Sequence, residues 1–290
     1  MTDRGCSHES ARKGAGETGV RMEAQQHEIT KMKVVYRESG MDAVTIHRDV
    51  EYRTGDAGSL TMDVYYPPDW NRDSRIPAVI FVSGYSDIGT QAKLGCKMKE
   101  MQSYISWGRL AAGAGLAGIT YSTREPAADA RAALEYVRQN AEQLGIDENR
   151  IGVWACSGNV PTALSVLARP GQAFLKCAVL CYGIMLDVDG STAVADAARQ
   201  WGFVNPAAGK SVDELPRALP LFIVRAGQDE FPHLNETIDR FLAKALVCNL
   251  PVTFVNHATA PHAFDLWHDS ETSREIIKEI LSFMRFHLLP

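Results

Sequence analysis

RIGVWACSGNVP, at residues 150–161, is an apolar run that leads directly into a serine flanked by small residues. A helix is expected to begin at once, because Pro161 is tolerated in a first helical turn. A strand, a sharp turn and a helix in this order have the layout of a nucleophile elbow, which lifts a hydroxyl above the end of a sheet. The pattern predicts Ser157 as a nucleophile.

The elbow has two alternative interpretations. The usual pattern is G-x-S-x-G, and here Ala155 and Asn159 occupy its outer positions. Ala155 is small, and Asn tolerates unusual backbone angles better than most residues. Cys156 could be the nucleophile instead, but that frame puts Trp154 at a crowded position. The other alternative is a serine in an ordinary turn that caps a helix.

Composition indicates a globular protein. The chain has 290 residues, of which 46% are hydrophobic and 22% charged, and its net charge is −5, an ordinary balance for a folded domain. We expect no nucleic-acid partner, since no stretch is densely basic, and no membrane partner, since no apolar run is long enough to span one. Residues 1–30 lack the apolar core of a secretory signal and are expected to be disordered or peripheral, which leaves residues 31–290 as the main domain.

The six cysteines predict neither a metal site nor a disulfide framework. Their spacing is not that of a zinc site and no histidine cluster accompanies them, so we expect no metal, no cofactor and a cytoplasmic protein with free thiols. The sequence is compatible with a homodimer but does not specify one. The cysteines stand at positions 6, 96, 156, 177, 181 and 248.

Hydrophobic patterning predicts an α/β fold. Two antiparallel-looking strands are followed by repeated strand–helix units, which implies a mostly parallel eight-stranded sheet with helices on both faces. We expect strands at 44–52, 60–66, 77–82, 116–121, 151–156, 175–184, 221–225 and 252–256. We expect helices at 91–112, 127–144, 158–168 and 233–248, and a closing amphipathic helix through 276–284.

Residues 186–220 interrupt this alternation and are too long for a simple connection. We interpret them as a small cap or lid insertion. The alternative is a crossover helix at about 191–201 followed by a surface loop. Trp201 and Phe203 lie here and are predicted to line an apolar substrate pocket.

A serine nucleophile requires a base and an orienting acid, and in this architecture the acid precedes the histidine in the chain. Asp229 follows a predicted strand and a glycine turn, with Glu230 as the second choice and a solvated loop acid as the alternative without a role. His262 follows the last predicted strand, and His257 and His268 compete with it. His257 directly ends that strand, and the alternative for it is a role that only caps the strand.

Serine hydrolases also stabilise the charge that develops on the carbonyl oxygen with two backbone N–H groups. One is expected from Gly158, the residue after the nucleophile. The other is expected from Tyr85, in the loop after the third strand, and the Tyr85 ring is also a predicted substrate contact. A tight glycine turn without a role is the alternative for residues 83–87.

The chain resembles the α/β-hydrolase superfamily, close to its dienelactone hydrolase and carboxylesterase branches. The resemblance covers roughly residues 45–290. It rests on DENRIGV at 147–153 before the elbow, on GQD at 227–229 as an acid turn, and on PHAF at 261–264 as the counterpart of a His-Gly-Phe signature. The superfamily's His-Gly after the third strand is Ser83-Gly84 here.

The resemblance implies an α/β-hydrolase fold and a serine hydrolase that cleaves small or medium carboxylic esters through an acyl-enzyme. Two alternatives within enzymes are a peptidase and a lactone or dienelactone hydrolase with the same triad. A ligand-binding module without catalysis on the same fold is the alternative from another class.

Overall fold

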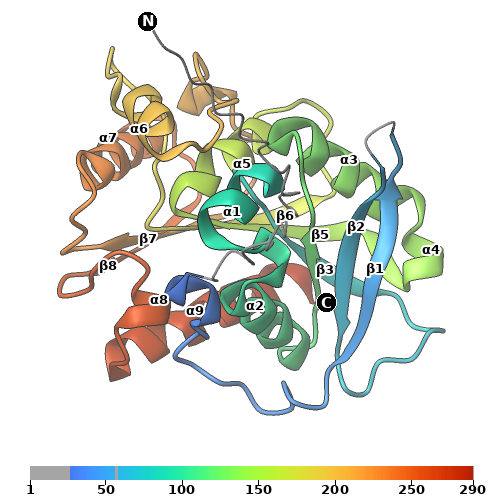
Figure 1. Ribbon diagram of the computed structural model, residues 1–290. Coiled ribbons are helices and arrows are strands. Elements are labelled where there is room, and N and C mark those ends of the chain that lie inside the picture. Colours follow the sequence, from blue (N-terminus) through green and yellow to red (C-terminus); the bar gives the residue numbers. More distant parts are fainter. Residues whose placement is uncertain (1–26, 56–57, 290) are drawn as a thin grey trace, which may run out of the picture.

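One eight-stranded sheet organises the protein (Figure 1). The computed structural model describes residues 27–55 and 58–289. The strands are β1 Thr45–Arg53, β2 Leu60–Tyr66, β3 Ile76–Phe81, β4 Ala117–Tyr121, β5 Ile146–Cys156, β6 Leu175–Cys181, β7 Leu221–Ala226 and β8 Val252–His257.

The strands follow the order β1-β2-β4-β3-β5-β6-β7-β8. The pairs β1–β2 and β2–β4 are antiparallel, and every other neighbouring pair is parallel. The predicted mostly parallel sheet is therefore confirmed. In such a sheet the carboxyl ends of the parallel strands share one edge, which is where ligands bind in open α/β folds.

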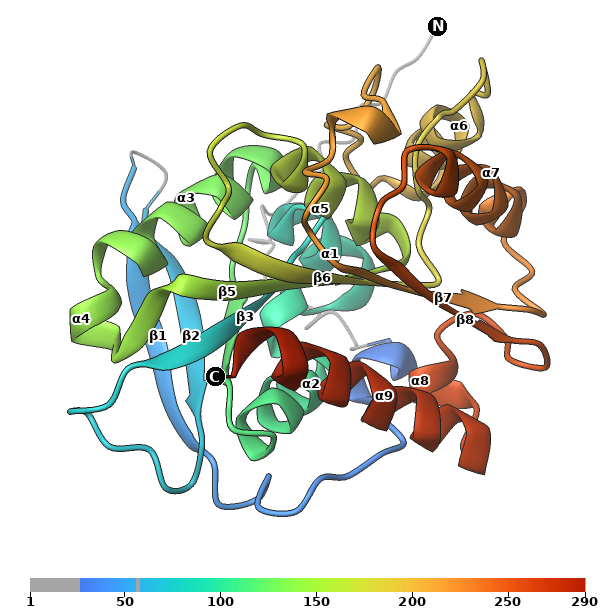
Figure 2. The ribbon, with the colours of Figure 1, turned by 180° about the vertical axis from the view of Figure 1, so that it is seen from behind.

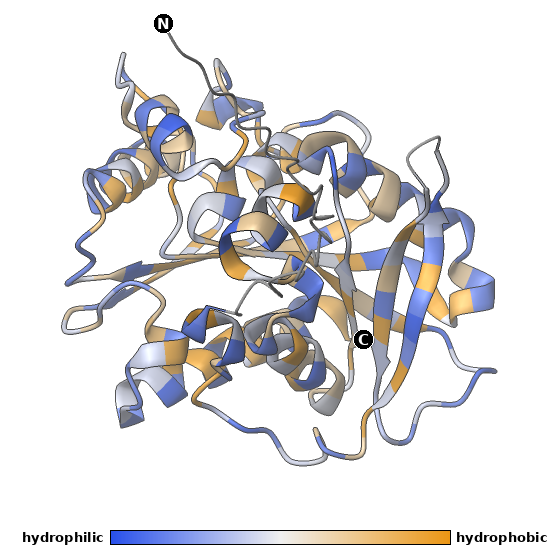
Figure 3. Ribbon diagram, viewed as in Figure 1, coloured by the Kyte–Doolittle hydropathy of each residue, from blue (hydrophilic) through white to orange (hydrophobic). Residues whose placement is uncertain are grey.

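Helices cover both faces of the sheet (Figures 1 and 2). The helices α2, α8 and α9 lie on one face, and α3, α5 and α7 lie on the other. Hydrophobic and hydrophilic residues alternate around these helices, as amphipathic packing requires (Figure 3). The helices are α1 Asp87–Leu94, α2 Gln102–Gly113, α3 Pro126–Gln139, α4 Ala141–Leu144, α5 Val160–Leu167, α6 Ala193–Trp201, α7 Leu234–Val247, α8 Phe264–Trp267 and α9 Glu271–Leu288.

Strand β3 shows why the central strands are apolar throughout. Ala78 and Ile80 belong to the core under α3 and α5, whereas Val79 and Phe81 belong to the core under α2 and α9. All four side chains are buried. A strand covered on both faces needs apolar residues at consecutive positions rather than at alternate ones.

The helix expected at 91–112 is wrong. The chain instead forms α1, a 3-10 turn at Met98–Glu100, and α2. Gly95 ends α1 with a left-handed backbone at φ 81°, a conformation that glycine adopts without the penalty of a Cβ atom. The interruption turns α1 toward the carboxyl edge of the sheet, so that Thr90 and Leu94 line a cavity there.

Two segments that the sequence analysis set apart from the strand–helix units are residues 186–220 and the N-terminal residues. Residues 186–220 contain α6 and a 3-10 turn at Val212–Glu214, so a crossover helix is present; action as a lid stays a prediction. Residues 1–26 lie outside the described residues. The adjoining 3-10 turn at Glu28–Lys31 includes a buried Thr30, and Ile29 lines the same cavity as α1.

Helix α2 packs on β4 through a contact between two glycines. A Cβ atom added to Gly118 would lie 2.6 Å from the carbonyl oxygen of Gly108. Backbone atoms cannot yield as a flexible side chain can, so any larger residue at 118 must push α2 off the sheet.

Gly118→Ala is therefore expected to lower the free energy of unfolding by about 1–3 kcal/mol, the usual cost of overpacking a core. Urea titration followed by circular dichroism measures it. Gly89→Ala is the matched control, because an added Cβ there meets nothing within 4 Å, and in a helix this change stabilises by roughly 0.5–1 kcal/mol. Equal destabilisation by both changes would contradict the packing argument.

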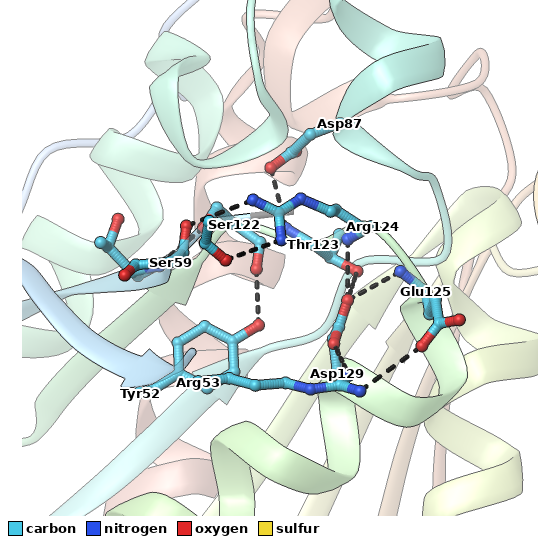
Figure 4. A network of polar contacts seen from close by, with 11 residues as sticks. Tyr52, Arg53, Ser59, Asp87, Ser122, Thr123, Arg124, Glu125 and Asp129 are labelled. Atoms are coloured by element: carbon cyan, nitrogen blue, oxygen red, sulfur yellow. Dashed lines mark hydrogen bonds and ion pairs between the residues drawn. The ribbon is translucent and has the colours of Figure 1, made fainter. Parts of the chain in front are cut away.

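A polar network joins the loop after β4 to β1, α1 and α3 (Figure 4). The Tyr52 hydroxyl donates to the carbonyl oxygen of Ser122 at 2.6 Å. The buried Asp129 carboxylate accepts the backbone N–H groups of Arg124 and Glu125, each at 2.7 Å, and pairs with Arg53. These contacts hold the loop in place at the carboxyl edge.

Asp87, the first residue of α1, also belongs to this network. Its Oδ2 atom accepts the Thr123 N–H at 2.8 Å, but burial raises the pKa of its carboxyl from 3.8 to about 6. Because the folded protein holds this proton more tightly than the unfolded chain, ionisation opposes folding. The free energy of unfolding should fall as pH rises from about 4 to about 6.

Asp87→Asn should remove this dependence, because the amide oxygen can still accept the Thr123 N–H. We expect the free energy of unfolding at pH 8 to exceed that of the wild type by about 1–3 kcal/mol, with little difference at pH 4. Urea unfolding at several pH values measures it, with the exposed Asp69→Asn as the control. A uniform loss of stability at all pH values would count against the argument.

Candidate active site

The elbow places Ser157 immediately beyond the end of β5. Its backbone is left-handed at φ 53°, a strained conformation for a residue other than glycine. A 3-10 turn at Ser157–Asn159 then leads directly into α5. The strained turn raises the hydroxyl above the carboxyl edge of the sheet, as the sequence predicts.

Ser157, His262 and Asp229 form a chain of hydrogen bonds. The Oγ atom of Ser157 lies 2.9 Å from Nε2 of His262, and Nδ1 of His262 lies 2.6 Å from Oδ2 of Asp229. The Asp229 side chain is fully buried, whereas that of His262 is 19% exposed. The other carboxylate oxygen of Asp229 accepts the N–H of Phe231 at 3.0 Å, so the acid is held in place from both sides.

Backbone contacts fix the acid against the base. The loop after β7 and the loop after β8 are joined by hydrogen bonds from Gly227 N to His257 O and from Gln228 N to Ala260 O, each at 2.8 Å. A Cβ atom on Gly227 would lie 2.5 Å from the carbonyl oxygen of Ala258. Glycine is thus required for the two loops to meet.

The competing residues lie elsewhere. Glu230 is exposed. His257 is buried and its Nε2 atom lies 3.0 Å from the Ser273 hydroxyl, and His268 contacts the same hydroxyl at 3.1 Å. Both histidines therefore contact the start of α9 rather than Ser157.

Asn159 ties the elbow to the loop after β3. Its Oδ1 atom accepts the N–H of Gly84 at 2.7 Å, and its Nδ2 atom donates to the carbonyl oxygen of Cys156 at 2.9 Å. A glycine at position 159 could make neither bond. The asparagine that departs from G-x-S-x-G therefore adds two hydrogen bonds, which the sequence alone did not indicate.

The residues expected to stabilise an oxyanion lie next to each other. A Cβ atom on Gly158 would lie 2.5 Å from the Tyr85 hydroxyl, so the loop after β3 borders the elbow. The Tyr85 N–H makes one long contact of 3.4 Å, to the Ser83 hydroxyl. The roles of both N–H groups stay predictions.

The segment 186–220 places two aromatic side chains against the loops that carry Tyr85 and Asp229. Phe203 is buried and packs edge-on against Tyr85, with ring centroids 6.0 Å apart. Trp201 packs on Phe231, and Phe231 packs on the His262 ring at 4.3 Å. Phe231 was not singled out from the sequence, although its position two residues after Asp229 could have indicated it.

A second buried acid lies near the histidine. Asp265 accepts the Tyr182 hydroxyl at 2.6 Å and the Trp107 indole N–H at 2.9 Å. Burial raises the pKa of its carboxyl. The Tyr182 ring packs edge-on against His262, with ring centroids 5.0 Å apart. Asp265 therefore contacts the imidazole through Tyr182.

A cavity of about 200 Å³ opens beside the triad. Ser157 and His262 line it, together with apolar residues of α1, α2 and α8. Trp201 and Phe203, the predicted pocket residues, do not line this cavity. The apolar lining consists instead of residues that no local sequence pattern indicates: Leu94, Met98, Met101, Tyr104, Trp107 and Leu266.

Comparison with solved structures identifies the architecture. A thermophilic esterase from Thermogutta terrifontis, with butyrate bound, is 20% identical with a TM-score of 0.57, and the match covers 86% of this chain and 97% of that one. An α/β-hydrolase enzyme from the Lake Arreo metagenome is 18% identical with a TM-score of 0.64, and the match covers 86% of each chain. The chain has the α/β-hydrolase fold.

A third similar structure is a hyperthermophilic esterase from Pyrobaculum calidifontis. It is 21% identical with a TM-score of 0.62, and the match covers 85% of this chain and 88% of that one. No protein-family model matches the sequence, and no curated protein matches it.

Two kinds of feature are absent from the described part of the chain. Across residues 27–55 and 58–289, no group of three or more His, Cys, Asp or Glu side chains is arranged to hold a metal ion. None of the helices in that part of the chain is both long and apolar enough to cross a membrane.

Cys156 directly precedes Ser157 but is a poor candidate for a nucleophile. Burial raises the pKa of its thiol to about 12, so at pH 8 only roughly one molecule in 10⁴ carries the reactive thiolate. We expect iodoacetamide to leave Cys156 unmodified in the folded protein and to modify it in urea, as read by peptide mass mapping. Rapid modification in the folded state would contradict this assignment.

Proposed function

We propose that the protein is a serine hydrolase that cleaves carboxylic esters through an acyl-enzyme. The observation that carries the proposal is the chain of hydrogen bonds from Ser157 through His262 to Asp229. The same three types of side chain, connected in the same way, perform acyl transfer on several unrelated folds. The similar structures described as esterases support it, including one described as phosphoramylated by tabun.

In the first step, Nε2 of His262 accepts the proton of the Ser157 hydroxyl while Oγ attacks the ester carbonyl. Asp229 holds Nδ1 of the imidazole as a donor, which fixes the tautomer and stabilises the imidazolium that forms. His262 then gives the proton to the leaving alcohol. A water molecule, activated by the same imidazole, releases the acid from Ser157.

Charge on the carbonyl oxygen requires nearby donors. We assign this role to the backbone N–H groups of Gly158 and Tyr85, because the loop after β3 borders the elbow. Asn159 is the positioning residue for this loop, since it takes up the N–H of Gly84 and thereby sets where residue 85 lies.

The size of the cavity favours small esters. A volume of about 200 Å³ is below the roughly 300–1,000 Å³ typical of sites for drug-sized ligands. A peptide segment would not fit it, so we favour an esterase over a peptidase. The dienelactone branch stays an expectation of the sequence resemblance. Trp201 and Phe203 stay substrate contacts predicted from the sequence, although neither lines this cavity.

Two finer expectations belong to this proposal. A cytoplasmic location is supported by five cysteines that are free among the described residues, since disulfides are rare in reducing compartments. A homodimer stays a prediction of the sequence, and light scattering of the purified protein would test it.

Ser157→Ala should lower kcat for p-nitrophenyl acetate by roughly 10⁴-fold or more, because the triad acts as a unit. Ser165→Ala is the matched control, since its hydroxyl bonds within α5 to Thr162 O. A fluorophosphonate probe should label Ser157 in the wild type, as located by peptide mass mapping. An adduct on another residue, or an active Ser157→Ala variant, would refute the proposal.

A further inference from the structure

The cavity beside Ser157 contains a phenol that the proposed reaction does not use. Tyr104 lies on α2, is 5% exposed, and packs edge-on against Trp154. Among the described residues its hydroxyl has no hydrogen-bond partner. Buried hydroxyls in proteins are nearly always paired, so this one is a candidate for pairing with a ligand.

The surroundings of the hydroxyl place it in the substrate cavity. Burial raises the pKa of the Tyr104 phenol well above its usual value, and the nearby Cys156, Tyr121, Tyr85 and Asp265 raise it further. Tyr104 itself and three of these neighbours, Cys156, Tyr85 and Asp265, line the same cavity as Ser157. The phenol therefore stays neutral and is able to donate a hydrogen bond close to the elbow.

A second donor lies beside it. The indole N–H of Trp154, which also lines the cavity, is buried with no hydrogen-bond partner within the described part of the chain. The group that faces it is the Cys181 thiol, and sulfur is a weak acceptor. An indole N–H can only donate, but this one faces Cys181, which does not line the cavity, so the Tyr104 hydroxyl is the unpaired donor that a ligand can reach.

The charge of the lining narrows the class of acceptor. Among the described residues, the lining contains the carboxyl of Asp265 and neither lysine nor arginine. An anionic substituent would thus meet a buried carboxyl with no lysine or arginine of that part of the chain beside it, which is unfavourable. A neutral oxygen is the acceptor that fits.

We propose that the cavity binds esters that carry a neutral hydrogen-bonding oxygen (a hydroxyl, a ketone or an ether) a few bonds from the scissile carbonyl, with Tyr104 as the residue that selects for it. The inference rests on the proposed ester hydrolysis and adds a substrate class to it. A plain alkyl chain of equal size would leave the Tyr104 hydroxyl unpaired.

The test compares matched esters in the wild type and in Tyr104→Phe. On the acyl side, p-nitrophenyl β-hydroxybutyrate is paired with p-nitrophenyl isovalerate, and p-nitrophenyl levulinate with p-nitrophenyl isocaproate. On the alcohol side, methoxyethyl acetate is paired with butyl acetate and followed by acid release. Each pair differs by one oxygen in place of one carbon, and intrinsic reactivity cancels when the two enzymes are compared.

The expected result is a fall of about fivefold in the ratio of kcat/KM for the oxygen-bearing ester to that for its carbon analogue. A fall in an acyl pair places the oxygen on the acyl side, and a fall in the alcohol pair places it on the alcohol side. An unchanged ratio in all three pairs would overturn the inference. Loss of an unpaired buried hydroxyl does not weaken the fold, so the variant is expected to be folded.

Tyr65→Phe is the matched control. Tyr65 is also fully buried with an unpaired hydroxyl among the described residues, but it lies on β2 and does not line the cavity, so its removal should leave every ratio unchanged. Hydrolysis of p-nitrophenyl acetate separates the two proposals. If the wild type neither hydrolyses it nor forms an adduct at Ser157, the proposed function fails. If all variants hydrolyse it and the ratios do not change, the substrate class alone fails.

Discussion

The left-handed backbone of Ser157 is the constraint on which the site depends. A residue other than glycine adopts φ 53° only where the surrounding structure enforces it. Here β5 delivers the serine from the centre of the sheet, and α5 departs at once, so the turn has no room to relax. The cores on both faces of the sheet therefore supply the stability that maintains this strain.

The proposed base and acid depend on a different kind of contact. Neither Asp229 nor His262 lies on a strand or a helix, yet both are held in place, because their loops bond to each other across Gly227. A short distance from Nδ1 to the carboxylate is thus a property of two loops together. The aromatic ring of Phe231, from the same loop as Asp229, then covers His262 from the side.

The sequence predicts the structure best where the signal is local. The strand alternation predicted the sheet because burial on both faces demands consecutive apolar residues, and the elbow and the two loops each follow a strand. The helix expected at 91–112 was wrong because an apolar pattern can continue through a left-handed Gly95, which the period alone does not detect. Tyr104 and Asp265 could not be placed, since their contacts depend on packing between segments far apart in the chain.

The bonded loops after β7 and β8 also limit how this protein can vary. An insertion or deletion between β7 and Asp229 would break the register with Ala258 and Ala260, and the carboxylate would lose its imidazole. The loop that follows β8 is subject to the same restriction. Changes of loop length that preserve the proposed triad must therefore occur elsewhere. The crossover around α6 borders the site without carrying a residue of that triad. It is the place where relatives with other specificities can diverge.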